Sequence, residues 1–176
     1  MDTKNVDVVR SLGDYKWNFL LCTELWEKYI SENHQIDFAN MQKIQFFDGS
    51  SASLSSEVDN IPNDKGGIYF YVLENPFVPE FGKYIMYVGR AHKTAYASLR
   101  QRAKSHYSDF VNARENSSLA RLYSDYAPYV RFHYVPVDGN DVIDKVEEEL
   151  IVSLTPPCND KIPSVRLRQK MRAFQY

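Results

Sequence analysis

The sequence contains few of the features that indicate a secreted or membrane protein. Its only cysteines are Cys22 and Cys158, and neither has another Cys or a His at metal-ligand spacing, which argues against a disulfide framework and a zinc site. No apolar run approaches the ~20 residues that span a bilayer, and the start, MDTKNVDVVR, lacks the pattern of a secretion signal. We therefore expect a cytoplasmic protein with reduced thiols and no membrane partner.

A strong charge of one sign is also missing, because the 176 residues have a formal net charge of −2. The charge is nevertheless unevenly distributed: residues 1–64 carry 11 Asp/Glu and 5 Lys/Arg, whereas residues 65–176 carry 12 and 16. Residues 90–106 and 161–176 contain Lys and Arg but no acid. Such clusters attract phosphate backbones, although basic clusters are also common on ordinary solvated faces.

The chain divides into three parts by composition. Residues 1–64 form an N-terminal helical extension and linker, residues 65–160 form the domain that carries the chemistry, and residues 161–176 form a basic tail. In the extension, apolar side chains three and four residues apart predict an amphipathic helix that ends near Asn33: Trp17, Leu20, Leu21, Leu25 and Tyr29. The segment 41–47 is open between a strand and a helix end. Residues 48–65, rich in Ser, Asp, Asn, Gly and Pro, predict a surface linker.

The stretch from Gly67 to Gly89 contains two runs with the two-residue period of β-strands. In the first run Tyr69 alternates with apolar neighbours, and in the second run Tyr87 does the same. Two adjacent strands would bring these tyrosines onto one surface, although both could instead be ordinary strand aromatics. The loop at 74–83 holds two prolines and a glycine. A third strand is predicted over 129–137 by composition and alternation.

Three helices are predicted around these strands. A helix over about 94–107 would carry Arg102 and His106 one turn apart on the same face. A second lies within 109–128, with Leu119 and Leu122 facing inward, and a third runs from Asp141 to about Leu154.

The third predicted helix carries an acid in an unusual place. Glu147 falls beside the stripe of apolar residues that this helix buries, whereas Glu148 points to the opposite side. A carboxylate next to such a stripe is costly to bury unless a cation or a hydrogen-bond donor meets it. Glu147 is therefore a candidate ligand for a cation, the alternative being a carboxylate at the edge of the stripe that reaches water.

In these polar positions, and in their order, the sequence resembles the GIY-YIG nuclease family. The matching segments cover roughly residues 66–160 and are Gly67-Ile68-Tyr69, Tyr87-Val88-Gly89, the helical segment Leu99–His106 with Arg102, and Glu147-x-x-Leu150-Ile151 followed by Pro156 and Asn159. The resemblance implies an α/β domain with a small three-stranded, mainly antiparallel sheet flanked by helices. It also implies hydrolysis of a phosphodiester in nucleic acid, most of all duplex DNA, with one Mg²⁺ (or Mn²⁺) ion.

The resemblance implies a role for each matched residue. Glu147 would bind the metal, since Mg²⁺ takes carboxylate oxygens and keeps several waters. Arg102 would hold the scissile phosphate, Tyr87 would position water or phosphate, and Asn159 would fix the geometry. The general base is open between Tyr69 and His106, because a phenol with a pKa near ~10 needs help to act at neutral pH whereas imidazole titrates in the right range.

The basic residues around these positions are candidates for nucleic-acid contact. They are Arg90, directly after the second motif, and Lys93, Arg100 and Lys104. The two motif tyrosines are 18 positions apart, farther than in compact family members, and the extra loop at 74–83 is expected to alter the rim of the active face. Such insertions resemble restriction or defence-type members of the family more than minimal homing-type modules.

Two other functions fit the same residues. One is a catalytically silent nucleic-acid-binding module with the same fold, and the other is a nuclease that acts on RNA as a toxin. The sequence also leaves a homodimer open, because one active site cuts one strand at a time and a double-strand cut needs a second site or a second event.

Overall fold

The structure, a computed structural model, describes residues 17, 19–31, 36–49, 52–78, 81–112 and 117–161 of the chain. Most of the basic tail, residues 162–176, therefore lies outside the described residues. The helices, 3₁₀ turns and strands in chain order are α2 (Thr23–Ser31), η1 (Phe38–Asn40), β1 (Gln42–Gln45), β2 (Phe47–Asp48), β3 (Ser53–Leu54), η3 (Ser56–Asn60), β4 (Gly67–Glu74), β5 (Lys83–Ala91), α3 (Leu99–Val111), α4 (Ser117–Tyr126), η4 (Ala127–Tyr129), β6 (Val130–Pro136) and α5 (Asn140–Leu154).

The main sheet has four antiparallel strands in the order β1-β6-β4-β5. An α/β fold with an antiparallel sheet and flanking helices is therefore confirmed, but the prediction of three strands was wrong. The fourth strand is β1, which comes from the N-terminal segment and pairs Ile44 with Phe132 of β6. Its four residues are too few for alternation alone to tell a strand from a helix end.

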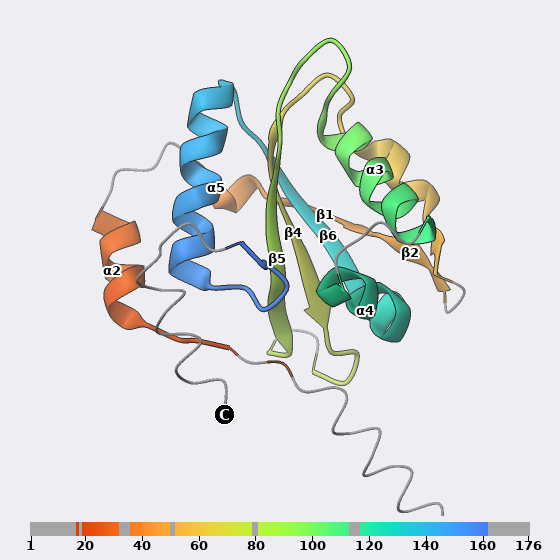
Figure 1. Cartoon of the computed structure of the whole chain (residues 1–176), viewed down its shortest axis with the longest axis horizontal. Coiled ribbons are helices and arrows are strands. Elements are labelled where there is room, and N and C mark those ends of the chain that lie inside the picture. Colours follow the sequence, from red (N-terminus) through yellow and green to blue (C-terminus); the bar gives the residue numbers. More distant parts are fainter. Residues whose placement is uncertain are drawn as a thin grey trace, which may run out of the picture.

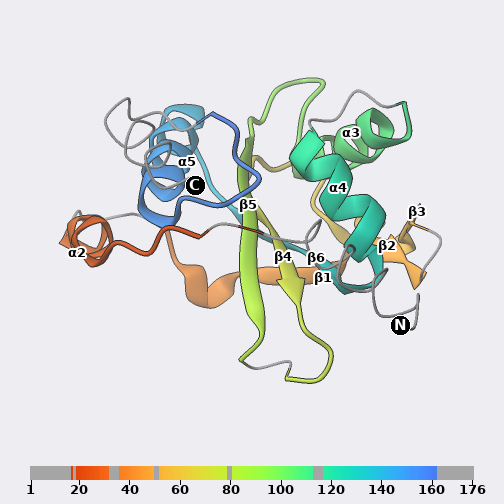
Figure 2. The same cartoon turned by 60° about the horizontal axis from the view of Figure 1, so that its bottom comes forward.

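Helices cover both faces of this sheet, as Figures 1 and 2 show. Helices α3 and α4 lie against one face, and α5, with α2 outside it, lies against the other. Among the described strands, β5 pairs with β4 alone and is therefore an edge strand. The edge of the sheet between α3 and α5 is consequently the place where residues from both layers can meet.

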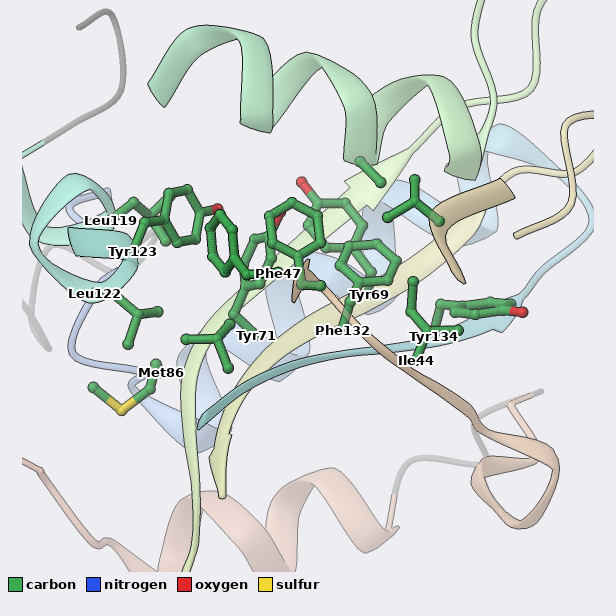
Figure 3. Close-up of a cluster of buried hydrophobic side chains, with 14 of the residues drawn as sticks. Ile44, Phe47, Tyr69, Tyr71, Met86, Leu119, Leu122, Tyr123, Phe132 and Tyr134 are labelled. Atoms are coloured by element: carbon green, nitrogen blue, oxygen red, sulfur yellow. The ribbon is translucent and has the colours of Figure 1, made fainter. Parts of the chain in front are cut away.

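Aromatic rings fill the layer between the sheet and α3/α4 (Figure 3). Tyr69 and Tyr71 of β4 and Phe132 of β6 are fully buried there, with the rings of Tyr69 and Phe132 stacked at 5.1 Å. Truncating a ring of this kind to alanine typically costs about 3–5 kcal/mol. Tyr69 is thus held in place by the core on which the stability of the domain depends.

The N-terminal part differs from the sequence-based expectation in two places. Helix α2 begins only at Thr23, and two of the described residues before it contact the domain: Trp17 packs on Tyr126, and Leu20 accepts a hydrogen bond from Thr155. The predicted surface linker at 48–65 also contributes two buried apolar side chains to the core, those of Val58 and Ile61.

The helix that carries Arg102 begins five residues later than predicted. Ser98 caps α3 by accepting a hydrogen bond from the Gln101 amide at 3.3 Å, so residues from Thr94 onward form the connection instead. The inward side chains predicted for Leu119 and Leu122 of α4 are both buried. Within the described parts of the chain, no helix has the length and apolar character needed to cross a membrane.

Candidate active site

A cleft of about 580 Å³ is lined by residues of the edge strand β5, of α3 and of α5. A β-bulge at Met86 shifts the register of β5 against β4, so that Tyr71 faces Tyr87 while Val72 faces Ile85. Bulges are common next to active sites because they re-aim side chains. Here Tyr87 packs on the α3 side of the sheet, while Arg90 reaches α5.

The cleft collects residues from three parts of the chain. Its lining comprises Tyr87 and Arg90 of β5, Arg102 of α3, Glu147, Glu148 and Ile151 of α5, and Asn159, Asp160 and Lys161 after α5. Four of the six predicted site residues are therefore at one cleft although they are up to 72 positions apart, from Tyr87 to Asn159. The other two, Tyr69 and His106, lie buried behind it.

On the α3 side, the hydroxyl of Tyr69 connects Arg102 to His106. Arginine can only donate, so Arg102 Nε donates to the Tyr69 oxygen at 3.2 Å. The same oxygen lies 2.7 Å from His106 Nε2, and it donates its proton to that nitrogen when the imidazole carries its own proton on Nδ1. The predicted placement of Arg102 and His106 on one helix face is confirmed, since both reach the same hydroxyl.

Burial governs the proton chemistry of Tyr69. The side chain is fully buried, and this desolvation raises the pKa of its hydroxyl well above the ordinary value; the Tyr87 phenol adds to the rise, and Arg102 opposes it. The nearby Tyr69 oxygen in turn raises the pKa of Arg102. Tyr69 thus remains a neutral phenol at neutral pH, and any proton that it accepts must be matched by one that it passes to His106.

Gly89 allows the Tyr69 hydroxyl to occupy this position. A Cβ atom on residue 89 would lie 2.4 Å from both Cζ and the hydroxyl oxygen of Tyr69, and 2.7 Å from the Tyr87 ring. Real Cβ contacts are essentially never under 3.0 Å. The glycine of the second motif is therefore required by the close approach of the two tyrosines to strand β5.

On the α5 side, charged groups hold one another across the edge of the sheet. Arg90 contacts the Glu147 carboxylate through Nη1 and lies 2.8 Å from Asp144 Oδ1 through Nε. His92, directly after the last residue of β5, also contacts Asp144. The Glu147 side chain is only 15% exposed, and burial raises the pKa of its carboxyl, while Arg90 opposes that shift. The acid beside the apolar stripe thus has a cation for a partner.

Asn159 joins the segment after α5 to the edge of the sheet. Its amide accepts a hydrogen bond from the Val88 N–H at 2.9 Å and donates one to the Val88 carbonyl at 2.8 Å. The neighbouring Cys158 amide donates to the Met86 carbonyl at 2.8 Å. These contacts satisfy an edge strand that would otherwise present unpaired groups. The Cys158 side chain is buried, which raises the pKa of its thiol to about 12.

The other predicted nucleic-acid contacts lie outside the cleft lining. Lys93 is exposed, and its main chain is bonded to Asn140. Arg100 donates to the Ile61 carbonyl at 2.6 Å, and Lys104 forms an ion pair with Asp59. Both therefore help to attach α3 to the preceding segment. Of the loop at 74–83, no described residue lines the cleft, because the loop lies at the far end of β4 and β5 from Tyr69.

The donor set of the cleft fits a magnesium-type ion. Among the described residues, no three His, Cys, Asp or Glu side chains are placed so that they could hold one metal ion together, so the ligands of a closed metal site are not gathered there. Glu147 instead offers a carboxylate that is poorly solvated and borders an open cleft. Mg²⁺ binds proteins through one or two carboxylates and keeps several waters, which this arrangement allows.

Sequence reasoning missed two members of the charged group, Asp144 and His92. Asp144 precedes Glu147 by three positions, which places it on the same helix face, and His92 follows Arg90 by two positions, just past the end of the strand. Those spacings were visible in the sequence. What was not visible is that α5 lies against the edge strand.

Comparisons of the chain with protein-family models, with curated proteins and with solved structures find no match. The function must therefore be inferred from the motifs and from the geometry of the cleft. That geometry combines an arginine on a buried tyrosine–histidine pair with a poorly solvated carboxylate across one sheet edge.

Proposed function

We propose that this chain is a divalent-metal-dependent endonuclease with a GIY-YIG-type core, and that its substrate is duplex DNA. The observation that carries the proposal is the cleft at β5, which gathers Arg102, Glu147 and Asn159 from separate parts of the chain. All three residues are positions at which the sequence matches the family pattern. If the match were due to chance, there would be no reason for these side chains to lie at one cleft.

The chemistry of the cleft suits phosphodiester hydrolysis. Arg102 is exposed at the cleft and can direct its remaining N–H groups at a phosphate while Nε stays on Tyr69. A guanidinium in this position stabilises the negative charge that grows on the phosphate in the transition state. Arg90 and Lys161 add further positive charge at the same cleft.

Glu147 is the residue that would hold Mg²⁺ or Mn²⁺. When bound, the ion supplies Lewis-acid stabilisation of phosphate charge. Glu147 is suited to this role because burial leaves its carboxylate short of solvation, so that a cation gains more from it than from a fully hydrated carboxylate.

Tyr69 and His106 form a proton relay in this proposal, with His106 as the final acceptor. Their 2.7 Å contact permits a proton to enter at the Tyr69 oxygen as another leaves to His106 Nε2. The raised pKa of Tyr69 disfavours a free phenolate, so Tyr69 is a poor general base by itself. We therefore assign the role of base to Tyr69 and His106 together. Tyr87, stacked 6.2 Å from Tyr69, would position the water or the phosphate.

Incubation of the purified chain with duplex DNA, single-stranded DNA and tRNA tests the proposal. We expect cleavage of duplex DNA that requires Mg²⁺, stops on addition of a chelator, and is lost in Glu147→Ala and Arg102→Ala. Binding of duplex without cleavage would instead identify a silent module, and cleavage of tRNA alone would identify an RNase. Sequencing of the product ends would show whether cutting is site-specific, as for a restriction or defence-type enzyme.

A further inference from the structure

We propose that Arg90 couples metal binding to nucleic-acid binding at this site: it neutralises Glu147 when no metal is present and exchanges that contact for a substrate phosphate when the metal binds. This inference rests on the proposed function, since it concerns the same cleft. Arg90 would thus link the binding of the metal to the binding of the phosphate, beyond adding positive charge to the cleft.

The guanidinium of Arg90 is shared between two carboxylates. Nη1 contacts Glu147 and Nε contacts Asp144, so the fork is divided between two turns of α5. At Glu147, Arg90 occupies the carboxylate that a metal ion would need. Because a divalent cation and a guanidinium repel each other at such short range, both cannot hold the Glu147 carboxylate at full strength.

The surroundings of Arg90 allow it to leave Glu147 without leaving the cleft. Its side chain is 41% exposed and lines the cleft, whereas that of Glu147 is only 15% exposed. Asp144 remains as a second partner of Arg90, and His92 contacts the same oxygen, Oδ1, of Asp144. A freed Nη group therefore stays at the rim, where a phosphate oxygen can accept its hydrogen bonds.

Exchange of this kind makes metal and nucleic acid promote each other's binding. A phosphate that draws Arg90 away from Glu147 removes the competitor of the metal, and a bound metal releases Arg90 for the phosphate. Thermodynamic linkage requires the two effects to be equal in size. The site would then be fully assembled only when both are present.

Calorimetric titration with Mn²⁺ at about pH 8, where carboxylates are ionised, gives the first test. Arg90→Ala should bind Mn²⁺ about fivefold more tightly than the wild type, which is the upper range for release of a half-exposed ion pair. Arg90→Lys, which keeps the charge without the fork, should fall between them. Lys93→Ala is the matched control: it removes one exposed charge nearby that contacts neither carboxylate, and its affinity should equal that of the wild type.

The second test measures the coupling itself with a short duplex whose linkages are phosphorothioates. In the wild type, the duplex should tighten Mn²⁺ binding and Mn²⁺ should tighten duplex binding by the same factor. In Arg90→Ala the factor should fall below that of the wild type, because only the direct attraction between the ion and the phosphates remains, and the duplex itself should bind more weakly. Circular dichroism of each variant verifies that it is folded.

The outcomes separate this inference from the proposed function. Mn²⁺ binding that Arg90→Ala leaves unchanged or weakens would overturn the inference alone, because Arg90 would then only orient Glu147. A wild type that binds no Mn²⁺, or whose binding survives Glu147→Gln, would remove the metal site and with it both proposals.

Discussion

The two sides of strand β5 build the same cleft in different ways. On the α3 side, Tyr69 and His106 are buried and joined by a hydrogen bond, and Arg102 is tied to them. On the α5 side, Arg90, Asp144 and Glu147 are held by charge, and Arg90 and Asp144 are over 40% exposed. The buried side is pre-organised by the core, whereas the ionic side can rearrange when a ligand supplies another partner.

The largest expected effect comes from the ionic side. Glu147→Gln keeps the shape of the side chain but removes its charge, so Mg²⁺-dependent cleavage should fall by roughly 10²-fold or more. The control is Asp141→Asn, an exposed acid on the same helix that does not line the cleft, and it should change the rate by less than about threefold. Gel analysis of end-labelled duplex measures both rates. Equal losses in the two variants would show that Glu147 has no special role.

The buried side is tested next, with Tyr69→Phe. Loss of the hydroxyl breaks the link between Arg102 and His106, and we expect cleavage to slow by about 10²-fold, the lower range for general acid–base catalysis. Stability should fall by only about 1–3 kcal/mol, because the ring still packs. Tyr123→Phe, a change in an equally buried tyrosine of the same core, is the control for activity. A fully active Tyr69→Phe would exclude the relay.

A smaller effect is expected for Asn159, which joins the α5 side to the edge strand. Asn159→Ala removes two hydrogen bonds to Val88, so the free energy of unfolding should fall by about 1–2 kcal/mol. Cleavage should slow by about tenfold, since the segment that bears Asp160 and Lys161 is then held at the edge strand by the Cys158 amide and no longer by Asn159. The matched change Asn112→Ala, at the exposed end of α3, should leave cleavage intact. Urea unfolding and cleavage assays on both variants provide the comparison.

The smallest effect concerns how stability changes with pH. Burial raises the pKa of Glu147, so the folded state favours its protonated form, and the stabilisation due to this group is complete below the ordinary Glu pKa. It is lost as the pH rises through the raised pKa. The Glu147→Gln variant has no ionisable group at this position. Its free energy of unfolding should therefore rise relative to that of the wild type over this pH range. Urea unfolding at a series of pH values measures the difference in the free energy of unfolding. If the wild type instead became more stable relative to the variant as the pH rises, the effect of Arg90 on the pKa of Glu147 would exceed that of burial.

How much the sequence predicted also differs between the two sides. The alternation around Tyr69 and Tyr87 and the four-residue spacing of Arg102 and His106 are local patterns, and the contacts they predicted are present. The ion pair between Arg90 and Glu147, and the part played by Asp144 and His92, were missed because they depend on how α5 crosses β5, which no local period encodes. Strand β1 was left undecided for a similar reason, as four residues show too little alternation and only pairing with β6 defines them.

The central claim is that both sides of β5 act on one phosphodiester, and a double variant tests it most directly. Single-turnover cleavage of a duplex would be measured for Arg102→Lys, Glu147→Gln and the two combined, because residues that act as a unit show strongly non-additive losses. We predict that the double variant is no slower than the slower single variant. Losses that multiply, or a wild type without Mg²⁺-dependent cleavage, would contradict the account.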